Sequence, residues 1–208
     1  MSPISLSLAK TAQRRLLVSS LAVILLLGIT LSRGRIAFEL GYAYGHGHFH
    51  GLAFPHDDYR AATWLLSAAR MGHARGQYLL GLYTSRGWGV QQDDAAAERW
   101  FNLAASQGYA PACFHLAWLY HKGEGVAHDE VRAQQLMARA ARLGMAGAAL
   151  ALGRFHERGE GVPANFKEAR RWYSRALDLG QQQPELFENI RYIEAARTAS
   201  ARLGMGNP

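Results

Sequence analysis

The chain has 208 residues, of which 49% are hydrophobic, and it carries a single cysteine and a formal net charge of +7. This length and composition allow one ordinary domain with a buried core. The basic excess lies at one end, because residues 1–35 hold five basic and no acidic side chains, whereas the other 173 residues hold 18 basic and 16 acidic ones. A nearly neutral body argues against a surface that follows nucleic-acid phosphates, and the lone Cys113 excludes an internal disulfide.

An uncharged run of 17 residues, 16–32, follows three basic residues and precedes Arg33 and Arg35. As a helix it would span about 25 Å, which suffices for a bilayer core of about 30 Å with some thinning. We expect an uncleaved signal anchor, since the run exceeds the usual apolar length of a secretory signal and no small-x-small pair clearly closes it. A cleaved signal is the alternative. The charge bias would hold residues 1–15 in the cytoplasm and place the remainder across the membrane, in the periplasm of a bacterium.

Four stretches of the chain superimpose at a fixed offset of 36 residues. Each carries Asp or Asn, then an alanine, a large residue, a second alanine and a glycine at constant spacing. The coincident positions are Asp57, Asp93, Asp129 and Asn165; Ala61, Ala97, Ala133 and Ala169; Trp64, Trp100, Leu136 and Trp172; Ala68, Ala104, Ala140 and Ala176; and Gly72, Gly108, Gly144 and Gly180. A fixed period in this range is typical of a stacked repeat protein.

Each unit is predicted to form two helices joined by a glycine turn. In the second unit the first helix covers about residues 74–86 and the second about 93–107, with Gly87-Trp88-Gly89-Val90 between them. A glycine just past the first helix suits a left-handed C-terminal cap, and the Asp or Asn that follows suits an N-cap. The last glycine of each unit is expected to close its second helix. Within that helix the tryptophan is expected to fill the gap between the two alanines.

The Gly-x-Gly-Val turns, the Asp…Ala-x-x-Trp second helices and the pairs Leu80-Gly81, Leu116-Ala117 and Leu152-Gly153 resemble the Sel-one-like repeat (SLR) family of tetratricopeptide-like proteins. The resemblance covers residues 74–181 closely and 36–73 more loosely, and Leu136 departs from the expected tryptophan. It implies an all-α, right-handed α/α superhelical solenoid that serves as a scaffold or adaptor in protein assemblies. Bacterial members of the family are often exported or tethered to a membrane.

The predicted organisation places one transmembrane helix before the repeats and one extra helix after them. Pro184 and Glu185 suit the start of that last helix, and the apolar stripe of Leu186, Ile190 and Ile193 would cover the last repeat. The predicted segments are a cytoplasmic tail at 1–15, a transmembrane anchor at 16–32, a degenerate first repeat at 36–73 with a histidine-rich loop, repeats at 74–109, 110–145 and 146–181, and a capping helix at 184–203.

The first helices would line the concave side of such a solenoid, where partner segments usually dock. The candidate partner-binding residues on this side are Tyr78, Leu82, Ser85, Phe114, Trp118, His121, Arg154 and Glu157. Positions 78, 114 and 150 are apolar in every full repeat, which internal packing also explains. Positions 82, 118 and 154 vary, as a recognition surface would, and Trp118 is the leading candidate because aromatic anchors dominate interface energetics.

One cluster has metal-ligand chemistry: His46, His48, His50 and His56, which lie in or beside a glycine-rich stretch. Alternating imidazoles could hold Zn²⁺ or Cu²⁺ or respond to pH. A solvated loop is the plainer interpretation, since a glycine-rich loop does not pre-organise ligands and Asp57 is already explained as a cap.

Catalysis is not indicated. The Gly-x-Gly turns follow helices rather than strands, so they are not phosphate loops, and the carboxylate pairs recur at helix starts, which capping explains. We therefore expect no enzyme, no cofactor, no nucleic-acid partner and no small-molecule substrate, while a hydrolase would need a groove site that the sequence does not show. The leading hypothesis is a membrane-anchored scaffold that binds a protein partner. The alternative is a metal- or pH-responsive membrane sensor built on residues 46–56.

Overall fold

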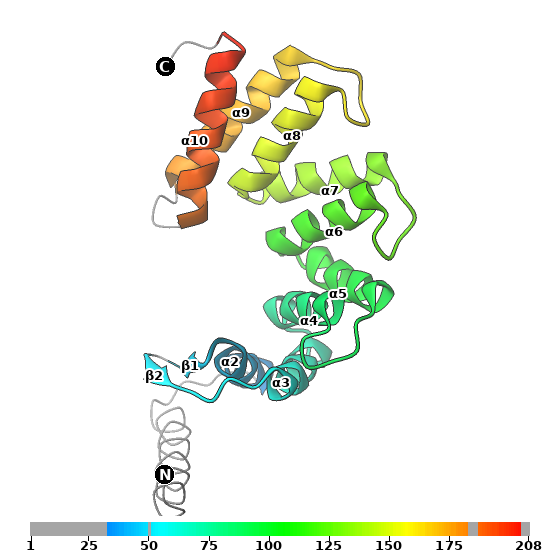
Figure 1. Cartoon of the computed structure of the whole chain (residues 1–208), viewed down its shortest axis with the longest axis vertical. Coiled ribbons are helices and arrows are strands. Elements are labelled where there is room, and N and C mark those ends of the chain that lie inside the picture. Colours follow the sequence, from blue (N-terminus) through cyan, green and yellow to red (C-terminus); the bar gives the residue numbers. More distant parts are fainter. Residues whose placement is uncertain (1–32, 50, 183–186, 205–208) are drawn as a thin grey trace, which may run out of the picture.

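The computed structural model describes residues 33–49, 51–182 and 187–204, and Figure 1 shows their helices in successive pairs along an open arc. The helices are α2 (Arg33–His46), α3 (Asp58–Arg70), α4 (Ala74–Arg86), α5 (Asp94–Ser106), α6 (Ala110–Lys122), α7 (Glu130–Arg142), α8 (Ala146–Arg158), α9 (Phe166–Gln182) and α10 (Phe187–Arg202). None of them combines the length and the apolar character needed to cross a membrane. The predicted tail at 1–15 and anchor at 16–32 lie outside the described residues.

The predicted helix starts are confirmed by the cap geometry. Asp57, Asp93 and Asp129 have extended backbones, and each side chain accepts a hydrogen bond from the amide three residues later, at 3.0, 2.8 and 2.9 Å. Asn165 accepts from the amides of Lys167 and Glu168, both at 3.1 Å. These contacts satisfy donors that the first turn of a helix leaves without a partner.

The two glycines of each Gly-x-Gly turn are required for different reasons. The first one, as in Gly87 with φ of 70°, is the left-handed C-cap of the first helix, which confirms the prediction. The second one, as in Gly89, also has positive φ, and a Cβ there would collide with the backbone of Asp58 in the preceding unit. The corresponding contacts are Gly125 with Asp94 and Gly161 with Glu130. Each turn therefore lies directly on the start of the second helix of the unit before it.

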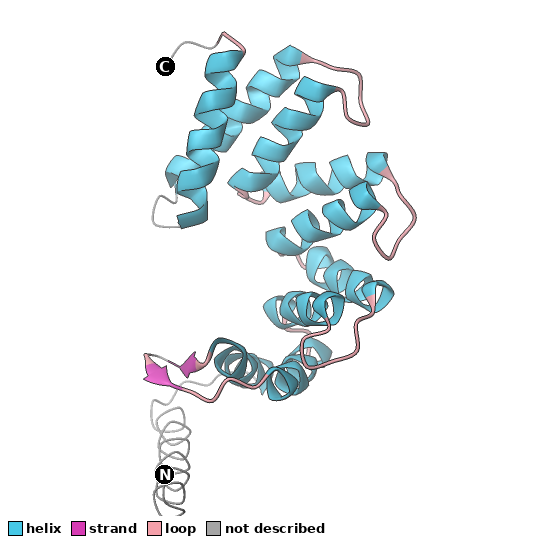
Figure 2. Cartoon of the chain, in the orientation of Figure 1, coloured by secondary structure: helices cyan, strands magenta, loops and turns pink. Residues whose placement is uncertain are grey.

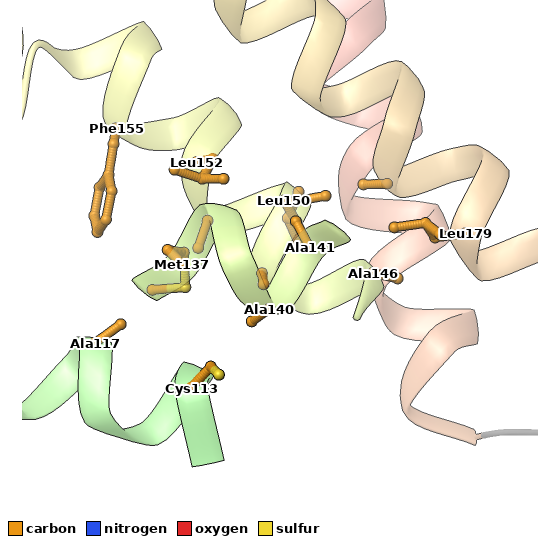
Figure 3. Packing of buried hydrophobic residues seen from close by; sticks show 14 of the residues in the cluster. Cys113, Ala117, Met137, Ala140, Ala141, Ala146, Leu150, Leu152, Phe155 and Leu179 are labelled. Atoms are coloured by element: carbon orange, nitrogen blue, oxygen red, sulfur yellow. The ribbon is translucent and has the colours of Figure 1, made fainter. Parts of the chain in front are cut away.

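The residue that fills the core in each unit is the one after the tryptophan position. Trp64 is 38% exposed, whereas Leu65 is 1% exposed, so the prediction that the tryptophan fills the gap is wrong for Trp64. Trp100 and Trp172 are partly buried and pack against the core. Leu65, Phe101, Met137 and Tyr173 occupy this buried position in the four units and are among the largest fully buried side chains of the described part. The alanines of the repeat are fully buried, as expected, and Figure 3 shows Met137, Ala140 and Ala141 among the packed side chains.

A small residue on the first helix faces this buried side chain in each unit. A Cβ added to Gly41 would lie 2.9 Å from Leu65, one added to Gly81 would lie 2.6 Å from the Phe101 ring, and one added to Gly153 would collide with Tyr173. In the third unit the corresponding residues are Ala117 and Met137, both fully buried in one cluster (Figure 3). The two aromatic rings, Phe101 and Tyr173, therefore face glycines, as does the branched Leu65, whereas the unbranched Met137 faces an alanine.

The last unit departs from the predicted pattern. Gly72, Gly108 and Gly144 have φ of 79°, 81° and 97° and follow the ends of α3, α5 and α7. Gly180 instead lies inside α9, which continues to Gln182, so the prediction that it closes the helix is wrong. Where the earlier units turn into the next first helix, α9 runs on beside α10, which packs on α9 and α8 (Figure 1).

The predicted capping helix corresponds to α10. Its Ala196 and Ala199 are buried, and Ile193 is partly buried. Residues 183–186 and the side chains of 187–190 lie outside the described part, and with them Leu186 and Ile190 of the predicted stripe.

The histidine-rich stretch forms a hairpin rather than the predicted loop. Strands β1 (His48–Phe49) and β2 (Leu52–Ala53) pair in antiparallel register, with Phe49 opposite Leu52 (Figure 2). Phe49 is buried, and its ring lies 6.3 Å from that of Phe54. The apolar residues next to the histidines therefore give this stretch a packed structure.

Candidate partner-binding face

The first helices α2, α4 and α6 lie on the inner side of the arc, and α3, α5 and α7 lie on its outer side; α8 continues the series of first helices (Figure 1). We call the inner side of α4, α6 and α8 the inner face. The residues that the sequence pattern proposed for partner binding belong to these three helices. Aromatic rings from all three helices lie close to one another.

These rings form a continuous series across the three repeats. The ring of Tyr78 on α4 lies 5.4 Å from that of His115 on α6, and His115 lies 6.1 Å from Phe114. Phe114 and Phe155 each lie 6.1 Å from the Trp118 indole. Tyr78, Phe114 and Trp118 are partly buried, so they pack on the core and also present ring surface to solvent. Such geometry permits apolar contact with a ligand at low entropic cost.

An arginine extends the aromatic series to α2. The guanidinium of Arg75 lies 5.0 Å from the ring centre of Phe38 and 5.2 Å from that of Tyr42. Burial raises the pKa of Tyr109, although the charge of Arg75 acts in the opposite direction. The sequence analysis did not select Arg75. Its position, three residues before the candidate Tyr78 on the same helix, was the available signal.

The imidazole of His115 is enclosed by this series. Its ring stacks on Phe101 at 5.8 Å, and burial, followed by the charge of Arg86, lowers its pKa. A neutral imidazole is therefore favoured in the folded chain. Burial also lowers the pKa of His73. The Nδ1 of His73 accepts a hydrogen bond from the amide of Gly76 at 3.1 Å and so caps the start of α4.

Two of the predicted residues contact charged groups within the chain. His121 Nδ1 lies 2.7 Å from Glu130 Oε2, which joins α6 to the start of α7. Glu157 lies 2.6 Å from Arg202 and accepts a hydrogen bond from the Tyr173 hydroxyl at 2.5 Å, which joins α8 to α9 and α10. Burial and then this hydrogen bond raise the pKa of Tyr173.

The other predicted residues have mixed environments. Leu82 is partly buried and packs against the cluster that contains Phe101. Ser85 donates to the carbonyl of Leu82 at 3.1 Å. Arg154 is exposed.

A pocket of about 370 Å³ opens between α8 and α10 at the C-terminal end of the inner face. It is lined by Leu150, Arg154, Arg191, Tyr192 and Ala195. The sequence analysis placed Arg154 on this face but missed the three residues of α10, because that helix lies outside the repeat period. The apolar stripe that predicted a capping helix was the only signal that its neighbours would border the face.

The histidines of the hairpin make contacts within their own segment. His46 stacks on Tyr42 with ring centres 3.8 Å apart and donates from Nδ1 to the Tyr42 carbonyl at 3.0 Å. His48 approaches the His46 carbonyl at 2.9 Å, and His56 lies 3.6 Å from Asp58. Across the described ranges, no three His, Cys, Asp or Glu side chains are grouped to hold an ion. His50 lies outside those ranges, so the metal site stays a prediction.

Comparisons with known proteins agree with the repeat pattern. The Sel1 repeat model matches residues 37–73, 74–109, 110–145 and 146–181. The structure is similar to that of a protective antigen of uropathogenic Escherichia coli with an SLR fold (27% identity, TM-score 0.65), covering 80% of this chain but only 38% of that protein.

It is also similar to a Sel1 repeat protein from Oxalobacter formigenes (28% identity, TM-score 0.63), covering 84% of this chain and 72% of that one. No curated protein matches the chain. With four consecutive matches over most of its length, the chain belongs to the Sel1 repeat family, as the sequence resemblance predicted.

Proposed function

We propose that this protein is a membrane-anchored scaffold whose inner face binds a segment of another protein. Sel1 repeat arrays generally act in protein–protein interaction. The proposal adds that residues 16–32 form a single transmembrane anchor, that the repeats lie on the periplasmic side, and that the array is a right-handed α/α superhelical solenoid. The charges on either side of residues 16–32 support the anchor and its orientation.

The observation that carries the proposal is the series of partly exposed rings on the inner face. Aromatic side chains in partly enclosed surroundings supply much of the binding energy at protein interfaces. Trp118 lies near the middle of the series, between Phe114 and Phe155. On the outer side, by contrast, Trp64 stands on α3 as an exposed tryptophan of the same size.

These two tryptophans provide a matched test. A photo-reactive amino acid would be introduced on the inner face of the full-length, membrane-bound chain, and cross-linked partners would be identified by mass spectrometry. The cross-link should be lost in Trp118→Ala and retained in Trp64→Ala. Because Trp118 also packs against the buried Phe155, Trp118→Leu, which keeps apolar contact with the core, should also lose the partner while its melting temperature stays closer to that of the wild type.

Two results would contradict the proposal. Cross-linking that is unchanged in both Trp118 variants would show that the ring series does not bind the partner. Equal losses in the Trp118 and Trp64 variants would point to general destabilisation rather than to a binding face.

A further inference from the structure

The helices of the inner face are almost free of carboxylates. The sequences of α4 and α6 contain no Asp or Glu, and α8 contains only Glu157. The same three helices carry five permanent cations, Arg75, Arg86, Lys122, Arg154 and Arg158. Most acidic residues of the repeats lie instead at the starts of the second helices and in the turns, as with Asp93 and Asp129, while Glu98 lies inside α5 and Asp178 inside α9.

The single carboxylate of these helices is already neutralised. Glu157 has a side chain only 13% exposed, and it is held by Arg202 and by the Tyr173 hydroxyl. It therefore adds little negative potential to the inner face. A ligand that approaches α4, α6 and α8 meets aromatic rings and positive charge together.

The pocket between α8 and α10 concentrates this charge. Two guanidinium groups, of Arg154 and Arg191, border a pocket whose other lining includes Leu150 and Ala195. None of the residues that line it is acidic, and within the part of the chain that the structure describes neither arginine makes an ion pair. Because both guanidinium groups border the same pocket, a carboxylate bound there could accept charge-assisted hydrogen bonds from them.

We infer that the partner segment on the inner face is acidic, with one of its Asp or Glu side chains between Arg154 and Arg191 and a neighbouring apolar side chain against Leu150. The inference rests on the proposed function and specifies the chemistry of its partner. The remaining acidic side chains of the segment would meet Arg75 and Arg86, since Lys122 and Arg158 already pair with Glu124 and Glu160. The apolar side chains between them would lie on the rings.

A peptide fits these features better than a nucleic acid. The repeat region as a whole is nearly neutral, and a phosphate backbone that ran past the inner face would meet the capping carboxylates, such as Asp93 and Asp129, at its border. A pocket lined by two guanidinium groups and by the apolar Leu150 and Ala195 suits a single carboxylate and an aliphatic neighbour.

The test uses the full-length chain in non-ionic detergent and fluorescence anisotropy. The labelled probe is a C-terminally amidated peptide in which glutamate alternates with leucine, so that its only carboxylates are in side chains. Its isostere, with glutamine for every glutamate, and a single-stranded oligonucleotide are measured beside it. The glutamate peptide should bind at least about tenfold more tightly than the glutamine peptide, and added salt should weaken its binding.

The variants locate the site. Arg154→Gln and Arg191→Gln should each weaken the glutamate peptide by several-fold to about tenfold, the range expected for a partly exposed charge-assisted contact. Arg99→Gln, which removes an exposed arginine from α5 on the outer side, should leave the affinity unchanged and serves as the matched control.

Equal affinity for the two peptides, tighter binding of the oligonucleotide, or equal effects of the three arginine variants would each overturn the inference. If the peptide result fails while the Trp118-dependent cross-link persists, the partner is not acidic but the binding face stands. If the cross-link is also independent of Trp118, the proposed function fails as well.

Discussion

Replacing Gly81 by alanine is expected to destabilise the array, although alanine favours a helix more than glycine does. The added Cβ would lie 2.6 Å from a ring carbon of Phe101, a side chain that is only 1% exposed and has no space to withdraw. Helix propensity alone would stabilise the variant by about 0.8–1 kcal/mol, whereas strong overpacking of a core costs about 1–3 kcal/mol. We expect the clash to dominate, with a net loss of about 1–2 kcal/mol, or about 2–8 °C in melting temperature.

The third repeat suggests the compensating change. There the facing residues are Ala117 and Met137, so Gly81→Ala combined with Phe101→Met recreates a pair that the chain already contains. The double variant should be more stable than the sum of the two single effects predicts, by about 1 kcal/mol. Urea unfolding of the full-length chain, followed by circular dichroism, would measure all four proteins.

A control separates propensity from packing. Ala95 is exposed on α5, so Ala95→Gly reports helix propensity with little change in core contacts. Two results would contradict this reasoning: a higher melting temperature in Gly81→Ala, or purely additive effects of Gly81→Ala and Phe101→Met. Either result would mean that steric contact between the Phe101 ring and residue 81 does not determine the packing of α4 on α5.

Two further perturbations test contacts at and near the inner face. Lowering the pH from about 6.5 to about 5 should reduce the free energy of unfolding, because the pKa values of His73 and His115 are lowered in the folded chain and the unfolded chain therefore binds more protons. In His115→Phe the melting temperature should decrease less steeply as the pH falls. An equal slope in the variant and the wild type would contradict this assignment. Glu157→Gln removes the negative charge that pairs with Arg202. Amide hydrogen exchange, measured by mass spectrometry, should therefore become faster in α10 but not in α4. Unchanged exchange in α10 would show that this ion pair does not hold the helix in place.

The features that follow from local chemistry could be read from the sequence. A capping carboxylate such as that of Asp93 accepts a hydrogen bond from an amide in the first turn of its own helix. Gly87 adopts the left-handed conformation because it has no Cβ. Both signals repeat every 36 residues, so they predicted the helix pairs, their order and the family.

The choice of the buried residue in the second helix depends on a neighbouring helix. Ala61, Trp64 and Ala68 form a helical stripe, but Ala61, Leu65 and Ala68 form one equally well. The contact of Leu65 with Gly41 on α2 decides between them, and that pairing cannot be inferred from the spacing within one helix. The larger indole of Trp64 therefore lies at the edge of the core, where it is partly exposed.

The environment of the candidate site depends on contacts that are distant along the chain. Glu157 was predicted on the partner-binding face, but its partner Arg202 is 45 residues away in a helix without the repeat. The same helix supplies Arg191 to the pocket. The repeat pattern located the inner face, whereas its charge and its C-terminal border required the packing of α10.

The contact between each turn and the preceding unit limits how this array can change in length. Gly89 lies against the backbone of Asp58, Gly125 against the Cβ and backbone of Asp94, and Gly161 against the side chain of Glu130. In the first two of these contacts, the atoms that set the spacing between neighbouring units have little freedom to move. One residue gained or lost within a turn would misalign every later pair. Duplication or deletion of a complete helix pair would keep each of these contacts, so such arrays can lengthen or shorten only in whole modules.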